Sequence, residues 1–289
     1  MRILITGANG TVGNAILSEL GDRDEYEFTC LDIEDHPDRD TVIADITDYD
    51  DIRPHFEDQD AVIHLAAAAE LSVPWDTVND LNINGTYNVL QAAADAEVED
   101  FIFASSIHTV GMYEIDHAPE LYDPEFDLSV THRDPPRPDS FYGVSKVFGE
   151  AMGRQFVESK PNPLGEIHPV YEINRRDYPT SFYSVRILTV LEEQYDHPYG
   201  LAETGVDEGW WERDSDSYDL MAKRMKCTWF SHRDLGQLVS RCLEDDSVDF
   251  DIFWGVSGNE STWVNLDHTQ DLLGYEPKDD GSVWDSPPS

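Results

Sequence analysis

The strongest restriction on the fold comes from a glycine-rich segment, TGANGTVG at residues 6–13, which follows an apolar stretch and opens a helical pattern. Glycine allows a tight turn and lets the backbone approach a pyrophosphate, and a helix N-terminus supplies free N–H groups. A glycine triplet alone fits a plain turn equally well, so the residues that follow decide. The positions predicted to contact a dinucleotide are Gly7, Asn9, Gly10, Thr11, Val12 and Gly13.

An acidic residue ends the next predicted strand, as dinucleotide binding requires. Asp32 lies 19 residues after Gly13, where a carboxylate accepts hydrogen bonds from ribose hydroxyls. Its charge would repel the additional phosphate of NADP, so the predicted cofactor is NAD. In so acidic a chain, Asp32 also fits an ordinary surface acid, and this alternative stays open.

Two later segments extend the cofactor prediction. Asp45 and Ile46 are expected near the adenine, while Leu65, Ala66 and Ala67 end a strand with small residues against which a cofactor can lie flat. Each is ordinary strand-end sequence when taken singly. Their order along the chain carries the prediction.

Apolar strands alternate with helical patterns through the first two thirds of the chain, which predicts an α/β fold with a doubly wound parallel sheet, the Rossmann fold. Strands are predicted at Arg2–Thr6, Glu27–Leu31, Ala61–Leu65, Phe101–Ala104 and Tyr183–Ile187. Helices are predicted at Val12–Leu20, Trp75–Ala94 and Ser140–Glu158.

After Ile187 the alternation stops, and residues 192–219 are acidic and aromatic, as in a substrate lobe or lid. Regular secondary structure is expected to resume at Cys227–Phe230. A helix at Asp234–Leu243, a strand at Asp251–Val256 and a helix at Leu266–Leu273 are expected to follow. The tail from Lys278 is predicted to be mobile. We therefore expect an NAD-binding domain at residues 1–187 and a smaller substrate-binding lobe at 188–289.

A candidate catalytic pair lies in the third predicted helix. Tyr142 and Lys146 are four residues apart, so both side chains lie on one helix face. A free tyrosine has a pKa near 10, and a neighbouring ammonium together with a positive nicotinamide ring would lower that pKa toward the range of a base. By itself, this spacing also fits a pair on a surface helix.

Taken in order, these motifs resemble the extended short-chain dehydrogenase/reductase superfamily, also called the NAD-dependent epimerase/dehydratase superfamily. The resemblance rests on TGxxGxxG, Asp32, HLAA at 64–67, Asn82, the Ser105-Ser106 strand end and YxxxK, and it covers residues 1–187. It implies bound NAD and a catalytic group of Ser106, Tyr142 and Lys146, the last two also contacting the cofactor. It further implies that Asn82 supports the cofactor and the active-site helix.

Two stretches, residues 103–111 and 137–146, are similar to uronate dehydrogenases and to haloarchaeal NAD-dependent glucose-6-phosphate dehydrogenases. Those enzymes oxidise the anomeric hydroxyl of a sugar to a lactone. The same resemblance implies that Arg224 faces the sugar. Ile107 and Ala69 depart from the family pattern, about ten additional residues separate Ser106 from Tyr142, and residues 192–220 form an insertion, so the substrate is left open.

The histidines and the basic cluster have alternative interpretations. His108 follows Ser106 by two residues and either contacts substrate or has a structural role. His132, His168, His197 and His232 have no metal-ligand spacing, so no metal is predicted. Arg224, with Lys223 and Lys226, either binds an anionic substrate or pairs with nearby acids such as Asp214, Asp216 and Asp219.

The net charge of the chain restricts which binding partners and which solution conditions suit the protein. A formal net charge of −41, from 60 acidic and 19 basic residues, repels nucleic acid and anionic membranes. Because molar salt screens such repulsion within about 3 Å, the composition favours a halophilic cytoplasm. Cys30, Cys227 and Cys242 lack CxxC spacing and indicate reduced thiols, and the initial strand leaves no room for a signal peptide. We expect a cytoplasmic homo-oligomer.

The predicted function is that of an NAD-dependent oxidoreductase acting on the anomeric C1 hydroxyl of a uronic acid, an aldose or a sugar phosphate. The alternative on the same scaffold is an NDP-sugar epimerase or dehydratase, although only about 100 residues follow Ile187 to bind a nucleotide. A third hypothesis, a non-catalytic NAD-sensing module, conflicts with the presence of Tyr142 and Lys146.

Overall fold

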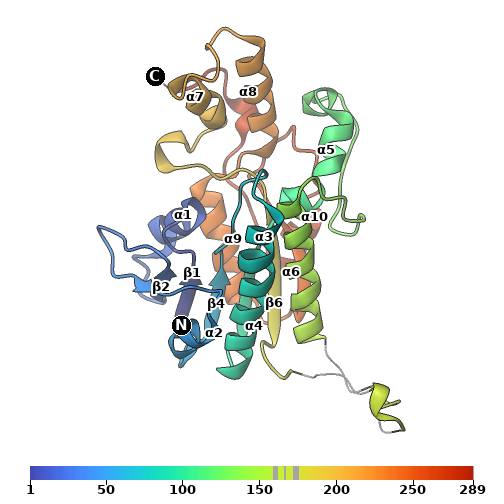
Figure 1. The fold of residues 1–289 in the computed structure, drawn as a ribbon. Helices are drawn as coiled ribbons and strands as arrows, with labels where there is room; N and C mark the ends of the chain where they lie inside the picture. Colours follow the sequence, from blue (N-terminus) through green and yellow to red (C-terminus); the bar gives the residue numbers. More distant parts are fainter. Residues whose placement is uncertain (159–161, 166, 172–175, 289) are drawn as a thin grey trace.

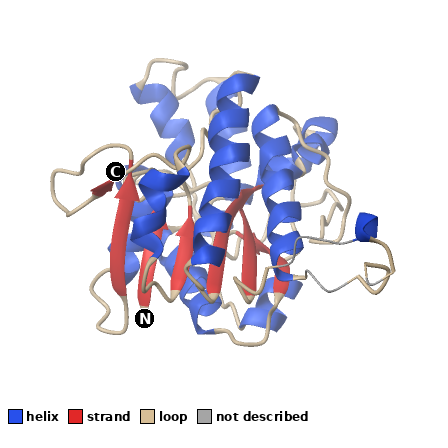
Figure 2. Cartoon of the chain, turned by 60° about the horizontal axis from the view of Figure 1, so that its bottom comes forward, coloured by secondary structure: helices blue, strands red, loops and turns tan. Residues whose placement is uncertain are grey.

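The computed structural model describes residues 1–158, 162–165, 167–171 and 176–288. Seven parallel strands form one sheet in the order β3-β2-β1-β4-β5-β6-β7 (Figure 2). The strands are β1 (Arg2–Thr6), β2 (Glu27–Asp32), β3 (Val42–Ile43), β4 (Ala61–His64), β5 (Asp100–Ser106), β6 (Ser181–Ile187) and β7 (Phe250–Gly255). The predicted doubly wound fold is confirmed. The two-residue strand β3 was not predicted, because it is too short to show an alternating pattern.

Helices cover both faces of the sheet (Figure 1). On one face, α1 (Thr11–Leu20) packs against α9 (His232–Glu244), and their apolar side chains share a core with β1 and β4. On the other face, α2 (Tyr49–Ile52), α4 (Thr86–Asp95) and α6 (Phe141–Val157) enclose a second core with β4 and β5. Burial on both faces explains why the central strands are continuous apolar runs.

The helix predicted at Trp75–Ala94 is not uniform. It consists of α3 (Trp75–Thr77), a π-helical stretch at Val78–Gly85 and α4. π-helical geometry is rare, so the apolar pattern was assigned to a single α-helix. The π-helical stretch carries Asn82, whose side chain is buried.

The lobe after Ile187 is more helical than its sequence indicates. Residues 192–219, expected to lack helices, contain α7 (Gly200–Asp207) and the start of α8 (Asp216–Thr228), which stand above the carboxyl ends of the strands in Figure 1. Helix α8 includes the first two residues of Cys227–Phe230, and the chain then returns through α9, β7 and α10 (Asp267–Leu273). Helix α7 contains two glycines, and α8 has five charged residues among thirteen, which weakened their apolar patterns.

The tail predicted to be mobile from Lys278 is packed as far as Trp284. The backbone N–H groups of Lys278 and Asp279 donate to the buried carboxylate of Asp234, at 2.7 and 3.0 Å. The Trp284 ring lies against His197 and Trp229, and its carbonyl accepts from Lys226. The prediction failed because these partners are distant in the sequence. Among the described residues, no helix combines the length and apolar character needed to cross a membrane.

Candidate active site

A cleft of about 510 Å³ opens where β1, β2 and β4 end. Eight predicted cofactor residues line it: Gly7, Asn9, Gly10, Asp32, Ile46, Leu65, Ala66 and Ala67. Thr11, Val12 and Gly13 form the first turn of α1 beside the cleft. Asp45 lies outside this lining, because its carboxylate accepts hydrogen bonds from the backbone and hydroxyl of Thr47.

The glycine turn fits a dinucleotide. Gly7 has a φ of +73°, and a Cβ there would come 2.6 Å from the backbone nitrogen of Ala66. A Cβ on Gly10 would meet only one atom within 4 Å, so this glycine leaves open space above the N-terminus of α1. That N-terminus has no side-chain cap, which leaves N–H groups available to phosphate. The buried Oδ1 atom of Asn9 also has no hydrogen-bond partner within the described part of the chain.

The Asp32 carboxylate is fixed at the edge of this cleft. Its Oδ2 atom accepts from the backbone N–H of Asn9 at 2.9 Å, and its Oδ1 atom accepts from Ile33 at 2.8 Å. These bonds connect the end of β2 to the glycine turn. The remaining acceptor capacity of the carboxylate suits a ribose diol.

We expect Asp32→Ala to weaken NAD binding about tenfold or more, since a charge-assisted hydrogen bond contributes roughly 1.5–3 kcal/mol. Removing the negative charge should also narrow the preference for NAD over NADP. Fluorescence titration with both cofactors measures the two effects. Asp45→Ala is the matched control and should change NAD affinity less than about twofold. Equal use of NAD and NADP by the unmodified protein would contradict the role assigned to Asp32.

The three predicted catalytic residues meet beyond the end of β5. Ser106 is the last residue of β5, and its hydroxyl lies close enough to Tyr142 on α6 to oppose the rise in the pKa of that phenol. One turn later on α6, the Lys146 Nζ atom lies 5.5 Å from the centroid of the Tyr142 ring and 5.0 Å from that of Phe103. The helix begins at Ser140, whose hydroxyl accepts from the backbone N–H of Gly143 at 3.0 Å. Strand and helix thus bring a hydroxyl, a phenol and an amine together.

Burial acts on both ionisable groups of this trio. It raises the pKa of Tyr142, against the opposing effect of the Ser106 hydrogen bond, and it lowers the pKa of Lys146 to about 7. The sequence prediction of a lowered tyrosine pKa is therefore not met by the chain alone. Desolvation disfavours both the phenolate and the ammonium, so ionisation of Tyr142 requires further positive charge next to it.

Two buried networks hold α6 in place: the first involves Asn82, to which the family resemblance gave this role, and the second, around Glu150, was not predicted. Asn82 donates to the Ser145 hydroxyl at 3.0 Å and to the backbone of Ala68 at 3.1 Å, which ties the π-helical stretch to α6. Glu150 accepts from Ser105 at 2.6 Å and forms a two-point ion pair with Arg186 at 2.8 Å. Because Glu150 lies one turn beyond Lys146, helical spacing from the catalytic pair is a signal that could have identified it.

His108 is held by an acidic residue that sequence reasoning did not assign. Its Nδ1 atom lies 2.7 Å from Asp139 Oδ2, and its ring meets Tyr142 edge to face with centroids 5.8 Å apart. Although burial opposes the ionisation of Asp139, hydrogen bonds from His108 and Ser140 keep its pKa below the usual value. Asp139 therefore fixes the imidazole beside the catalytic tyrosine.

Arg224 is paired, but not with the acids expected from the sequence. Its Nε atom donates to Glu114 Oε1 at 2.6 Å and its NH2 group to Oε2 at 3.2 Å. Glu114 lies on α5 (Gly111–His117), and the Tyr122 hydroxyl also donates to it at 2.6 Å. The partner is thus far from Asp214, Asp216 and Asp219 in the sequence, and spacing alone could not reveal it.

Comparison with known proteins places this geometry among NAD enzymes. A profile of the NAD dependent epimerase/dehydratase family matches residues 3–163. The chain is 33% identical to the NAD-dependent glucose-6-phosphate dehydrogenase of Haloferax volcanii, across 98% of this chain and 95% of that protein. It is 32% identical to the L-arabinose 1-dehydrogenase (NAD(P)(+)) of the same organism, across 98% of each.

A solved structure supports the same relationship. Glucuronic acid dehydrogenase from Chromohalobacter salexigens is 26% identical and superposes with a TM-score of 0.71, covering 98% of this chain and 86% of that one. The similarity therefore includes the lobe as well as the sheet.

Proposed function

Because this chain belongs to the NAD-dependent epimerase/dehydratase family, we propose that it is an NAD-dependent sugar dehydrogenase that oxidises an anomeric hydroxyl to the lactone. The observation that carries the proposal is the meeting of Ser106, at the end of β5, with Tyr142 and Lys146, which lie on one face of α6. This group is suited to removing a proton from an alcohol. NAD, when bound, accepts the hydride that leaves the carbon of that alcohol.

The chain's own residues remove the proton of the substrate hydroxyl. Tyr142, as the phenolate, takes the proton of the C1 hydroxyl while the C1–H bond gives up its hydride, and the C1=O bond of the lactone forms. Ser106 donates to the same substrate oxygen and orients it. Lys146 stabilises the phenolate when it is protonated; burial lowers the pKa of Lys146 to about 7, so the ammonium competes with the neutral amine near neutral pH.

The substrate is a neutral aldose rather than a uronic acid or a sugar phosphate. The support is Arg224, which the family resemblance places against the sugar and which here holds Glu114 with two hydrogen bonds. Glu114 is buried, and its carboxylate takes the two hydrogen bonds from Arg224 that a substrate carboxylate would otherwise accept. An anionic sugar would have to displace Glu114 within a strongly acidic protein.

The test is NADH formation in molar KCl with neutral pentoses and hexoses, uronic acids, sugar phosphates and UDP-sugars. We expect neutral aldoses to give the highest kcat/KM and a lactone product. Turnover confined to UDP-sugars would instead support an epimerase or dehydratase, the alternative on this scaffold. The similarity to a putative UDP-glucose 4-epimerase covers only 51% of this chain, which gives that alternative less support.

Glu114→Gln should release Arg224 and lower KM for uronic acids and sugar phosphates by about tenfold, the effect of one charge-assisted hydrogen bond. KM for neutral aldoses should stay within about twofold. Adding Arg224→Met to this variant should remove the gain. Since breaking a buried ion pair costs roughly 3–5 kcal/mol, melting temperatures must be compared first. Equal changes with charged and neutral sugars would mean that the pair is purely structural.

A salt-rich cytoplasm is the environment that the composition favours, and the similarity to Haloferax and Chromohalobacter proteins supports it. The expected homo-oligomer remains a prediction. It is supported by a groove of about 520 Å³ lined by exposed apolar side chains, among them Leu71, Ile115, Phe141 and Val144.

A further inference from the structure

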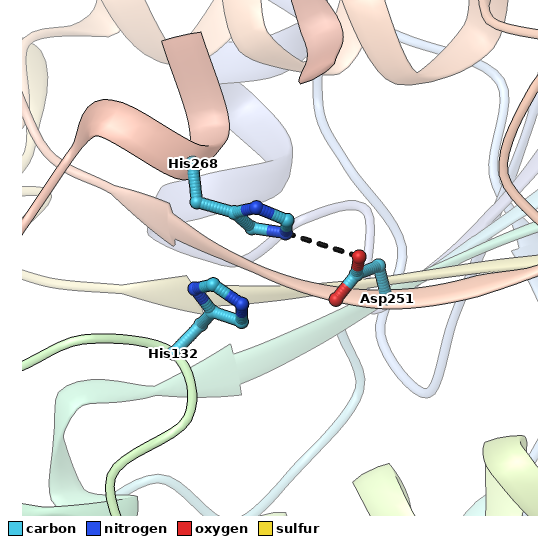
Figure 3. Close-up of side chains that lie close together, drawn as sticks. All are labelled: His132, Asp251 and His268. Atoms are coloured by element: carbon cyan, nitrogen blue, oxygen red, sulfur yellow. Dashed lines mark hydrogen bonds and ion pairs between the residues drawn. The ribbon is translucent and has the colours of Figure 1, made fainter. Parts of the chain in front are cut away.

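Three side chains with metal-binding chemistry meet at a place distant from the catalytic residues (Figure 3). His132 comes from the segment that follows the bridge between Val130 and Val264, Asp251 from the start of β7, and His268 from α10. Their separation in the sequence explains why spacing indicated no metal site. Only the fold brings two imidazoles and a carboxylate together.

The ligand atoms of the three side chains all lie within 4.8 Å of one another. His268 Nε2 lies 3.0 Å from Asp251 Oδ2, and the two imidazole rings are stacked with centroids 3.6 Å apart. Figure 3 shows both rings on the same side of the Asp251 carboxylate. All three side chains are half-buried, which gives an ion access and lets the rings turn.

We propose that His132, Asp251 and His268 bind one divalent transition-metal ion of the zinc type. Two imidazole nitrogens and one carboxylate oxygen are a ligand set that Zn²⁺ uses in proteins, with water at the fourth position. Ligand atoms on one tetrahedral zinc, at about 2.0–2.2 Å from the metal, lie roughly 3.3 Å apart. The His268 Nε2–Asp251 Oδ2 distance of 3.0 Å is already near that spacing, and the other separations, all within 4.8 Å, would have to shorten.

The surrounding charges are compatible with a cation. Arg133 Nε donates to His132 Nε2 at 3.1 Å, and this exposed side chain must swing away if that nitrogen binds the metal. Arg186 and Arg154 line the adjoining cavity of about 450 Å³, but they pair with Glu150 and Glu158.

The position assigns the metal a structural role. Asp251 is the second residue of β7, at the amino ends of the parallel strands, whereas Ser106 ends β5 at the opposite edge of the sheet. A bound ion would join the 132 segment, β7 and α10. It should therefore raise stability and leave turnover unchanged.

The experiment uses the NAD-bound protein, freed of metals by a chelator and kept in molar KCl, with Zn²⁺ added under equilibrium dialysis. We expect one more Zn²⁺ ion bound per chain than Mg²⁺ ions in the control. At a free Zn²⁺ concentration a hundred times Kd, we expect a melting temperature about 5 °C higher. His132→Gln, His268→Gln and Asp251→Asn should each weaken Zn²⁺ binding at least about tenfold. His55→Gln, another half-buried histidine, should not.

Two outcomes would overturn the proposal. One is Zn²⁺ binding that is equally strong in all three variants and in the His55→Gln control, which would assign it to the general acidic surface. The other is binding of Mg²⁺ with the same affinity and the same rise in melting temperature. Far-UV circular dichroism and NAD titration of each variant separate a lost ligand from a lost fold.

Discussion

Tyr142→Phe is expected to reduce kcat for sugar oxidation by about 10²–10⁴-fold, the usual contribution of a general acid–base group, while NAD affinity stays within about twofold. The substitution removes the phenolic oxygen that Ser106 contacts, but it keeps the ring that packs against His108. The substrate proton then has no acceptor at the place where Ser106 holds the oxygen.

Steady-state NADH formation and NAD titration by fluorescence measure the two quantities separately. Tyr87→Phe is a suitable control, because Tyr87 is exposed on α4, outside the catalytic group. A Tyr142→Phe enzyme that retains more than about a tenth of the original rate would remove Tyr142 from the mechanism. A parallel loss of NAD affinity would mean that the ring had moved.

Dilution from molar KCl into about 50 mM salt is expected to unfold the protein. With 60 acidic and 19 basic residues, at most 19 carboxylates can have a basic side chain to themselves, so most remain uncompensated. Their mutual repulsion is screened within about 3 Å at 1 M salt, but it reaches beyond about 10 Å below 0.1 M. The repulsion then acts across the whole surface and opposes the compact state.

Far-UV circular dichroism during stepwise dilution measures the transition. Sucrose at matched water activity is the control, and it should not protect the fold if screening is the cause. An unchanged spectrum and melting temperature in low salt would contradict the halophilic interpretation. Protection by sucrose equal to that by KCl would assign the effect to hydration.

The features that could be predicted from the sequence are those whose parts lie close together in the chain. The glycine turn, Asp32 and the pair Tyr142 and Lys146 each depend on a local spacing, and the alternation of strands and helices fixed the fold class. The structure brings these residues to one edge of the sheet, as parallel strands require.

The remaining features depend on contacts between distant segments. Glu114 and Arg224 are 110 residues apart, and Glu150 on α6 meets Arg186 on β6, 36 residues later. No local pattern indicates such partners, in particular when acids are so abundant that any arginine has many candidates.

The placement of β7 has a consequence for how this chain can be divided. The chain leaves the sheet after β6, builds α7, α8 and α9, and only then adds β7 beside β6. A fragment ending at Ile187 would leave β6 as an open edge strand, with unpaired N–H and C=O groups and apolar residues such as Phe182 and Val185 beside them. Such an edge recruits other chains and aggregates. A cofactor-binding fragment made for engineering would therefore have to keep β7, joined to β6 by a short linker in place of the lobe.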